Sequence, residues 1–435
     1  MAPVDDRRNV LATCRFIHSA DIHLDSPMRG LSDDAPDTAR RLRLATREAL
    51  THLVDAAIER GVDFLLIAGD LYDGDWRDYQ TGVFFVAQMQ RLATAGIPVY
   101  LIHGNHDAQN HMTRALKLPD NVHVFSAESA ETKTVAGLDV ALHGMSYAER
   151  AVTDNLVPGY PAPKPGCFNI GLLHTALGGR DGHANYAPCT LAELTAKGYD
   201  YWALGHVHGA EVLAREPHVV FCGNLQGRSV RETGAKQAFE VVVEEGRVVE
   251  MTPIHCDVAR WAVTDIDISA AEDFNDVLAV MRQALAAEAA EADGRLLAIR
   301  LRLTGQTALH EALLADPERL LAEARTSAAG TGSAEIYVEA VRLACQPTAH
   351  AGDRAEREDA LGELARLLES AADDDDVQSM VAADIRPLIE RLPHDIRADV
   401  DDALLAAAIE GDTATLVRGA SRYLLARLSQ APGNA

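Results

Sequence analysis

Residues 64–70 read Phe-Leu-Leu-Ile-Ala-Gly-Asp, a short apolar run that ends in a glycine and an aspartate. An unbroken apolar run of this length is typical of a strand that is covered on both faces in an α/β sheet. The glycine permits close backbone approach, and the aspartate stands where open α/β sheets usually place their ligands. The stretch therefore predicts a layered α/β fold. It also predicts that the functional site lies at the sheet edge where this strand ends.

Four more polar blocks follow apolar runs in the same way. They are Asp21-Ile22-His23, Gly104-Asn105-His106-Asp107, His174 and Gly205-His206-Val207-His208. Divalent first-row metals prefer this mixture of oxygen ligands and imidazole. One such block is common by chance, but five in this order and spacing indicate a site for two metal ions.

The spacing within the blocks explains how the side chains can meet. Asp21 and His23 are two residues apart, as are His206 and His208, and side chains at such positions of an extended chain point the same way. The two oxygens of Asp70 can each face one ion, so this carboxylate can bridge two cations. The mixed nitrogen and oxygen ligands favour Mn²⁺ or Fe, and Zn²⁺ is also compatible.

Periodicity divides the chain into three parts, as expected for a length of 435 residues. Residues 1–260 are expected to hold strands at 15–19, 64–68, 99–102, 122–124, 140–144, 169–173, 201–204, 219–221, 238–243 and 247–253, with helices at 39–60, 81–95 and 191–197. A small α+β domain at 261–348 is expected to have strands at 262–268, 296–303 and 335–343 and helices at 273–289 and 310–324, beginning as a βαβ unit. After a linker at 350–353, C-terminal helices at 354–371, 377–392 and 397–428 occupy the region 354–430.

The amino-acid composition limits which cellular compartments and which kinds of partner are expected for this protein. The formal net charge of −25 argues against a general nucleic-acid coat, since phosphate backbones are held by Lys and Arg. Six scattered cysteines without a CxxC pair predict reduced, mostly buried thiols. No segment has the apolar length of a signal peptide or a membrane span, so we expect a cytoplasmic protein. The C-terminal helices are amphipathic and fit either a self-packed bundle or a docking arm for a partner.

The five blocks together resemble the calcineurin-like metallophosphoesterase superfamily, whose pattern is D-x-H, GD-x-x-D, GNH-D/E, H and GH-x-H. Here the second element extends from Gly69-Asp70 to Asp73. The resemblance implies a layered β-sandwich core flanked by helices. It also implies two ligand sets: Asp21, His23, Asp70 and His208 for one metal, and Asp70, Asn105, His174 and His206 for the other.

In this family pattern His106 is not a ligand but faces the substrate. An imidazole has a suitable pKa to protonate the leaving oxygen, and Asp107 is expected to orient it. Two cations about 3.5–4 Å apart can bind a bridging water and lower its pKa, so that hydroxide attacks phosphorus. The catalytic residues predicted from the sequence are therefore His106 and Asp107.

Longer segments are similar to the DNA-repair exonucleases of the SbcD group, and above all to the YhaO-type branch. They are residues 16–27, 182–189, 199–208 and 223–228. The stretch Leu24-Asp25-Ser26-Pro27 departs from the His-Leu-Gly common in SbcD, so its substrate rules do not transfer directly. The resemblance adds a capping domain after the nuclease core and C-terminal helices that engage a coiled-coil ABC-type ATPase of the SbcC/YhaN kind.

Substrate contacts are expected beside the metal ligands. His183 and Tyr186 lie on a Gly-rich loop after His174, where they either touch substrate or are exposed to solvent. Arg228 and Arg231 follow a predicted strand and either face phosphate or lie on the surface.

The leading hypothesis is a metal-dependent DNA phosphodiesterase, a 3′→5′ exonuclease with single-strand endonuclease activity as an additional option, working with Mn²⁺ in DNA repair or end processing. The first alternative is a phosphoesterase of small molecules. The second is a scaffold that binds DNA ends and an ATPase, with little activity alone. DNA is the expected partner, no membrane is involved, and a homodimer is left open.

Overall fold

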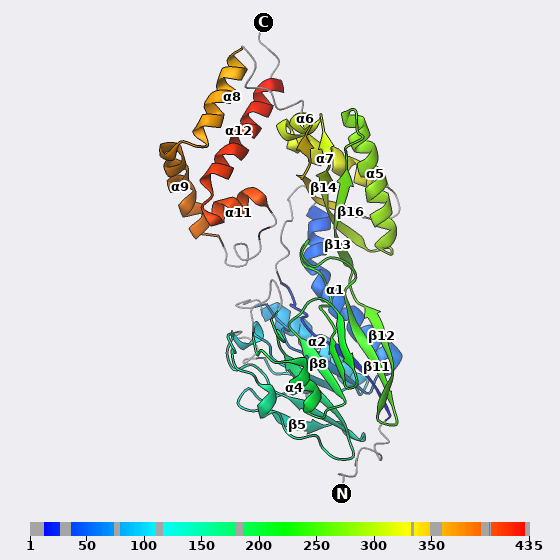
Figure 1. The fold of residues 1–435 in the computed structure, drawn as a ribbon. Helices are drawn as coiled ribbons and strands as arrows, with labels where there is room; N and C mark the ends of the chain where they lie inside the picture. The colour runs from blue at the N-terminus through cyan, green and yellow to red at the C-terminus, as the bar shows by residue number, and fades with distance from the viewer. Residues whose placement is uncertain are drawn as a thin grey trace. The chain divides into compact units, whose positions relative to one another are not determined.

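The computed structural model describes residues 13–26, 36–73, 79–109, 116–179, 186–331, 335–348, 359–392, 400 and 402–430 (Figure 1). The chain divides into two compact units. The first comprises Met1–Ala262 with Arg295–Ala298, and the second comprises Val263–Gly294 with Ile299–Ala435.

Two six-stranded sheets form the body of the first unit. One has the order β12-β11-β1-β2-β3-β4, with bounds β12 Arg247–His255, β11 Gln237–Glu244, β1 Cys14–Ser19, β2 Phe64–Ala68, β3 Val99–Ile102 and β4 Val122–Val124. The other has the order β5-β6-β7-β8-β10-β9, with bounds β5 Glu131–Thr134, β6 Val140–Gly144, β7 Phe168–His174, β8 Tyr201–Gly205, β10 His218–Phe221 and β9 Glu211–Arg215. Strands β1 to β4 run parallel, and so do β6, β7 and β8.

The inner faces of the two sheets share one hydrophobic core. Phe16 of β1 and Phe64 of β2 stack with ring centroids 5.0 Å apart, and Tyr201 of β8 meets Phe16 edge-on. His18 is also buried between the sheets, where its ring nitrogens meet the Tyr201 hydroxyl at 3.0 Å and the Leu204 carbonyl at 3.2 Å. Burial lowers the pKa of His18 to about 3, so this histidine is a neutral core residue.

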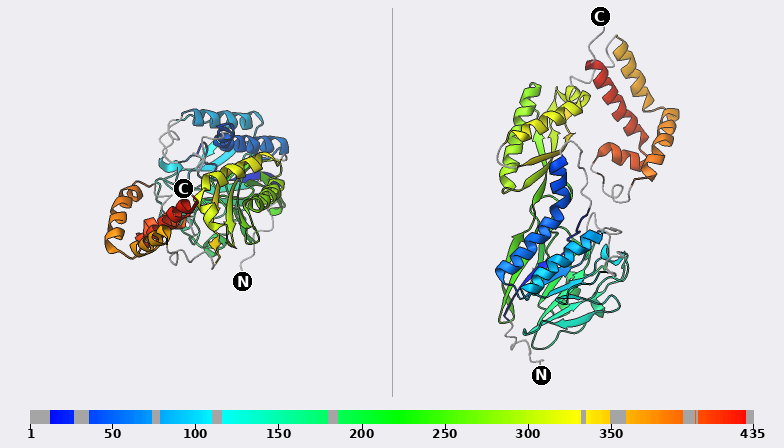
Figure 2. Two further views of the ribbon diagram at one scale, coloured as in Figure 1. Left: turned by 90° about the horizontal axis from the view of Figure 1, so that it is seen from above. Right: turned by 180° about the vertical axis from the view of Figure 1, so that it is seen from behind.

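Helices cover the outer faces of the sandwich. Side chains of α1 (Pro36–Arg60) and α2 (Tyr79–Thr94) pack on the outward-facing residues of β1 to β3, which alternate along each strand with the residues of the inner core. Figure 2 shows the two helices side by side. On the other sheet, α4 (Leu191–Ala196) packs beside Trp202. Because β2 and β3 are covered on both faces, their sequences are apolar throughout.

The second unit is mixed. A three-stranded sheet that belongs to it for the most part has the order β13-β14-β16, with bounds β13 Ala259–Asp267, β14 Leu296–Thr304 and β16 Ile336–Leu343. This unit also contains three helices, α5 (Phe274–Glu291), α6 (His310–Ala315) and α7 (Pro317–Ala329). Two further short strands, β15 (Gln306–Thr307) and β17 (Gln346–Pro347), pair with each other. The C-terminal helices are α8 (Ala360–Ala371), α9 (Asp375–Glu390), α11 (Ala403–Glu410) and α12 (Thr413–Gln430). Helix α12 packs against α6, α8, α9 and α11.

The predicted α/β fold class is confirmed, with a β-sandwich core and helical C-terminal region. Two predicted helices are wrong in extent. The helix expected at 310–324 is interrupted at Asp316, because Pro317 disfavours helical conformation in the preceding residue and Asp316 caps α7 through the Arg319 amide. The helix expected at 397–428 is interrupted at Gly411, which adopts a left-handed conformation with φ 77°.

Several expected segments fall partly or wholly outside the described residues: the linker at 350–353, residues 354–358 and residues 397–399. All six cysteines are unpaired, and five of them are buried, as predicted. Within the described parts of the chain, no helix combines the length and apolar character that crossing a bilayer requires.

Candidate metal centre

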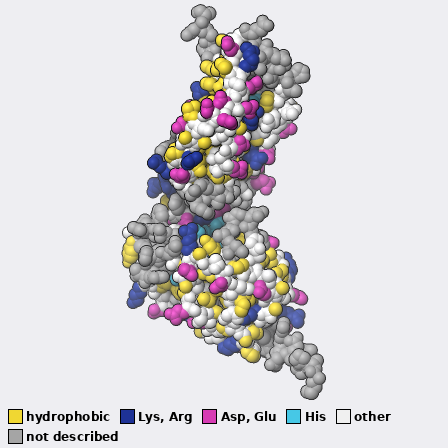
Figure 3. Space-filling model, turned by 60° about the vertical axis from the view of Figure 1, so that its left-hand side comes forward, with side chains coloured by type: hydrophobic (Ala, Val, Ile, Leu, Met, Phe, Trp, Pro, Cys, Tyr) yellow, Lys and Arg dark blue, Asp and Glu magenta, His cyan; other side chains and the backbone are white. Residues whose placement is uncertain are grey.

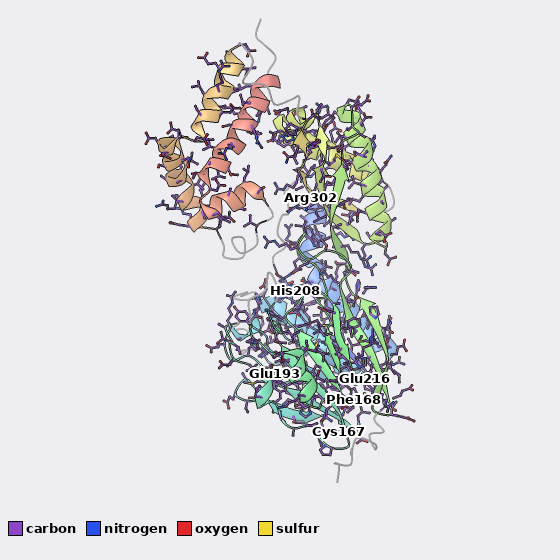
Figure 4. All side chains as sticks on the ribbon, in the orientation of Figure 1. Cys167, Phe168, Glu193, His208, Glu216 and Arg302 are labelled. Carbon is purple, nitrogen blue, oxygen red and sulfur yellow. The ribbon has the colours of Figure 1, made fainter. Side chains whose placement is uncertain are left out.

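The five polar blocks meet at one end of the sandwich. Parallel strands end at the same edge of their sheet, and the blocks after β1, β2, β3, β7 and β8 all follow carboxyl ends. In Figure 4, His208 lies at one end of the first unit and Phe168, the first residue of β7, lies toward the other. Strand direction therefore brings together side chains that are up to 187 positions apart, from Asp21 to His208.

Backbone hydrogen bonds hold the first two loops together. The Asp21 amide donates to the Gly69 carbonyl and the His23 amide to the Asp70 carbonyl, each at 3.0 Å. Asp21, His23, Asp70 and His206 have left-handed φ values of 49°, 45°, 51° and 98°. Such a conformation costs a residue other than glycine about 1–3 kcal/mol and persists only where the surroundings impose it. The loops are thus held in a strained shape that aims their side chains inward.

Two glycines leave room for this packing. Gly69 has a φ of 96°, and a Cβ built on it would collide with the ring of His174. A Cβ on Gly104 would collide with the carboxylate of Asp70 and the same ring. Any larger residue at either position would displace a predicted ligand.

The first group of candidate ligands is Asp21, His23 and His208, whose ligand atoms all lie within 4.8 Å of one another. The Nε2 atoms of His23 and His208 face each other at 3.1 Å, and Asp21 Oδ1 is 3.9 Å from His208 Nε2. Asp21 is fixed because its two oxygens accept the His206 amide at 3.1 and 2.9 Å.

The second group is Asp70, His174 and His206, again within 4.8 Å, with Asn105 beside it. His174 Nε2 lies 3.0 Å from Asn105 Oδ1 and 3.4 Å from Asp70 Oδ2. The other ring nitrogen of His174 lies 3.0 Å from the Ala68 carbonyl, which can only accept a hydrogen bond. Nδ1 therefore carries the proton in the neutral ring, and the Nε2 lone pair is directed at the group.

Asp70 joins the two groups. Its Oδ2 is 3.4 Å from His174 Nε2 and 3.9 Å from His23 Nε2, so one carboxylate faces both sets of nitrogen ligands. Carboxylate, amide and imidazole ligands that converge from two sides on a shared oxygen fit a pair of divalent cations. The donor set of this structure therefore fits the two metals that the sequence predicts.

Burial and mutual charge set the protonation of the group. Burial raises the pKa of Asp21 to about 6. Burial opposes ionisation of Asp70 as well, but neighbouring His174 outweighs it and holds the pKa of Asp70 well below its usual range. Burial lowers the pKa of His174, and Asp70 more than compensates, raising that pKa to about 9. Negative charge is thus concentrated on the carboxylate between the two groups.

The predicted catalytic residues are placed differently from each other. His106 is partly exposed and its Nδ1 lies 2.8 Å from Asp73 Oδ1. Burial lowers the pKa of His106, but the hydrogen bond with Asp73 outweighs it and raises this pKa. Asp107 instead accepts the backbone amides of Leu71, Tyr72 and Gly104 at 2.9–3.1 Å. The carboxylate beside His106 is therefore Asp73, whereas the sequence pattern favours Asp107.

Sequence reasoning also missed Glu232, which has no motif to mark it. Its Oε1 lies 2.7 Å from His208 Nδ1, so the Nε2 lone pair of His208 is directed at the first group. Burial opposes ionisation of Glu232, but Arg228 and His208 hold its pKa well below the usual range. A carboxylate behind a metal-binding histidine fixes the tautomer and orientation of the ring.

The residues predicted to bind substrate lie in different surroundings. His183 lies outside the described residues. Tyr186 lies beside the second group, with its ring centroid 5.8 Å from that of His206. The guanidinium of Arg228 is near the first group but is engaged by Glu232 and Ser26. Arg231 is exposed on the surface.

The centre is reachable from solvent at part of its rim. His106 and His208 have side chains that are 28% and 18% exposed, whereas His174 is fully buried. Figure 3 shows histidine side chains reaching the surface on the visible face, with acidic and basic side chains interspersed over that face.

Comparison with known proteins agrees with this geometry. Residues 14–210 match the calcineurin-like phosphoesterase family, and residues 261–346 match the middle domain of metallophosphoesterase YhaO. The uncharacterized metallophosphoesterase YhaO of Bacillus subtilis is 39% identical over 269 residues, which cover 61% of this chain and 65% of YhaO.

Weaker similarity extends to DNA double-strand break repair proteins named Mre11. That of Methanopyrus kandleri is 27% identical over 216 residues, covering 45% of this chain and 44% of the relative. That of Sulfurisphaera tokodaii is 24% identical over 273 residues, covering 59% and 66%. The chain thus spans between about two fifths and two thirds of the length of these relatives.

The fold, the converging side chains and the family match agree on a calcineurin-like phosphoesterase domain at residues 14–210. The chain carries a calcineurin-like metallophosphoesterase domain followed by a YhaO-type middle domain, which confirms the family predicted from the motifs and agrees with the YhaO-type branch.

Proposed function

We propose that the protein is a two-metal-dependent DNA phosphodiesterase, a 3′→5′ exonuclease whose site also accepts single-strand endonucleolytic cleavage. The observation that carries the proposal is the position of Asp70, whose Oδ2 faces His23 at 3.9 Å and His174 at 3.4 Å. A carboxylate shared by two ligand groups is the arrangement that two-metal hydrolysis of phosphate esters requires.

The choice of DNA as substrate is supported by relatives. Two of them, from Methanopyrus kandleri and Sulfurisphaera tokodaii, are named as DNA double-strand break repair proteins. All seven predicted ligands lie within residues 14–210, the part of this chain that matches the calcineurin-like phosphoesterase family. A role in DNA repair or end processing follows from that similarity as part of the proposal.

Seven side chains would hold the cations. Asp21, His23, Asp70 and His208 would bind one ion, and Asp70, Asn105, His174 and His206 the other, with Mn²⁺ as the proposed metal. When bound, the two ions supply an activated water and neutralise charge on the phosphate.

The remaining chemistry belongs to side chains of this protein. His106 has one ring nitrogen at Asp73, so its Nε2 is the atom that can hand a proton to the leaving oxygen of the nucleotide. Its partial exposure allows that contact with substrate. Asp73 orients the imidazole and stabilises its protonated form. Asp107 ties the loop after β3 to the loop after β2 by accepting three backbone amides.

A nuclease assay tests this function. End-labelled single- and double-stranded DNA would be incubated with the full-length protein and Mn²⁺ or Mg²⁺, alongside p-nitrophenyl phosphate and a cyclic nucleotide. We expect Mn²⁺-dependent release of nucleotides from the 3′ end. Much faster hydrolysis of the small phosphate esters than of DNA would contradict the proposal and favour a small-molecule phosphoesterase. No hydrolysis of any substrate would favour a scaffold.

Docking of a coiled-coil ATPase is proposed for the C-terminal helices. Leu367 of α8 and Met380 and Leu388 of α9 are 61%, 60% and 63% exposed, so α8 and α9 present apolar side chains to solvent. A pull-down would compare the full chain with a chain ending near residue 350. Equal capture of the ATPase by both would contradict the docking role.

A further inference from the structure

Two sequence segments remain without a role in the chemistry above: Asp25-Ser26 after the first ligand block, and the turn from Gly227 to Glu232. Both reach the metal centre. Ser26 is 5% exposed, and its hydroxyl donates to Asp73 Oδ2 at 2.5 Å. The second carboxylate oxygen of Asp73, Oδ1, meets His106. Ser26 therefore contacts the group that orients the proposed acid.

Arg228 connects this serine to the opposite side of the centre. Its Nη1 donates to Ser26 Oγ at 3.2 Å and lies 3.7 Å from Asp73 Oδ2. Its Nη2 donates to Glu232 Oε1 at 2.8 Å, and the same oxygen meets His208 Nδ1 at 2.7 Å. One guanidinium thus joins the carboxylate behind His106 to the carboxylate behind His208.

The loop that carries Ser26 is itself fixed. Asp25, in a left-handed conformation with φ 59°, accepts hydrogen bonds from Arg47 of α1 and Thr81 of α2, and its amide donates to Thr46. The side chain next to Ser26 is therefore clamped by two helices of the rigid sandwich.

Two carboxylates hold the guanidinium of Arg228 from opposite sides. Asp73 and Glu232 flank Arg228, whose side chain is 18% exposed, and the Nε of Arg228 lies 3.3 Å from both oxygens of Glu232. A guanidinium has five N–H donors in a fixed plane. When carboxylates bind it on both sides, it therefore fixes their positions relative to each other. Few of those donors are left to point at a phosphate.

From these contacts we infer that Ser26 and Arg228 are positioning residues. They fix the Asp73–His106 pair relative to the Glu232–His208 pair, so that the ring of His106 faces the leaving oxygen of the substrate. The inference rests on the proposed phosphodiesterase function. It differs from a phosphate-binding role for Arg228. A contact with phosphate would change the affinity for substrate, whereas the position of His106 determines how well this residue transfers a proton.

Leaving-group dependence separates the two roles. The full-length protein with Mn²⁺ would be assayed on aryl esters of thymidine 5′-phosphate, from p-nitrophenyl to unsubstituted phenyl. A phenolate that is a poor leaving group needs a proton, and a p-nitrophenolate does not. For Ser26→Ala we expect kcat on the phenyl ester to fall by about 10²-fold, the size of effect that a misplaced catalytic group produces. The p-nitrophenyl ester should be hydrolysed at nearly the wild-type rate, with KM unchanged throughout.

Matched controls come from the second unit. Ser421 is a buried serine of α12, and Arg300 forms a partly buried pair with Glu339 at 2.7 Å. Ser421→Ala and Arg300→Lys should leave the leaving-group dependence unchanged. Arg228→Lys should reproduce Ser26→Ala, and if that variant does not fold, Ser26→Ala alone decides.

A readout without metal or turnover completes the test. The Nδ1 proton of His106, assigned by its loss in His106→Ala, should shift in the NMR spectrum of Ser26→Ala and stay in place in Ser421→Ala. Equal rate losses on all esters, a raised KM in Arg228→Lys, or an unshifted proton would overturn the inference. A wild-type protein that hydrolyses none of the diesters would overturn the proposed function, and the inference with it.

Discussion

The two units of the molecule differ in what they bury. The first unit encloses ionisable side chains at its centre, among them Asp21, His23, Asp70 and His174, each at most 1% exposed. In the described part of the second unit, no Asp, Glu, His, Lys or Arg side chain is buried; its buried side chains with polar groups are Thr307, Thr413, Ser421, Tyr337 and Cys345. Burial of a charge is costly unless it is paired or binds a metal. The contrast therefore assigns the chemistry to the sandwich and packing to the second unit.

Backbone strain follows the same division. Left-handed residues other than glycine gather at the ligand loops of the first unit, whereas Asp293 is the one in the described second unit. Strain of this kind persists where a rigid framework imposes it and where it serves a site. The comparison leads to four predictions, arranged from the largest expected effect to the smallest.

Asp70→Asn should cause the largest loss. The substitution removes the charge that both ligand groups share, and charge stabilisation by bound cations contributes several kcal/mol, so kcat should fall by about 10³-fold or more. The measurement is phosphodiester hydrolysis at saturating Mn²⁺, with metal binding followed by calorimetry. Near-normal turnover in this variant would remove the reason for placing the chemistry at Asp70.

His106→Ala should reduce kcat by about 10²–10⁴-fold, the usual contribution of a general acid. Calorimetric Mn²⁺ affinity should stay at the wild-type value, because His106 is assigned to the leaving group. A parallel loss of metal affinity would instead make His106 a ligand, as the grouping of His23, Asp73 and His106 within 4.8 Å would allow.

Leu301→Ala probes the second unit. Leu301 is fully buried in β14, and truncation of such a leucine costs about 2–5 kcal/mol of stability. Urea unfolding followed by circular dichroism should show this loss, while kcat on a small phosphodiester stays unchanged below the transition. A reduced kcat in the folded variant would show that the second unit takes part in the chemistry and would break the comparison.

Glu232→Gln has the smallest expected effect. Loss of the carboxylate behind a metal-binding histidine typically weakens metal affinity by about 10–100-fold. Calorimetry should show this for one of two Mn²⁺ ions. Glu339→Gln, which alters the Arg300 pair of the second unit, serves as the control and should bind Mn²⁺ like the wild type.

Much of the fold was predictable because the central strands are covered on both faces. Strands β2, β3 and β6 lie inside their sheets and have the predicted bounds, since each is a mostly apolar run with clear turn signals beside it. The edge strand β4 also has its predicted bounds. Four strands were missed: β5 and β9 are the edges of the second sheet, and β15 and β17 are only two residues long. Edge strands are half exposed, so their sequences carry little apolar signal.

The convergence of the proposed ligand side chains was predictable because they stand at strand ends, and strand direction brings those ends together. Their supporting residues were not. Glu232 reaches His208 across 24 positions with no motif, and Ser26 meets Arg228 across 202. Asp73 is part of the family pattern, but its contact with His106 depends on the shape of two loops. Local sequence predicts strand ends, and only tertiary packing decides which carboxylate faces which histidine.

A crystal grown with excess Mn²⁺ and examined by anomalous scattering tests the central claim most directly. The account predicts two manganese ions, one among Asp21, His23 and His208 and one among Asn105, His174 and His206, with the carboxylate of Asp70 bound to both. A single ion, or a pair of ions that Asp70 does not bridge, would contradict it.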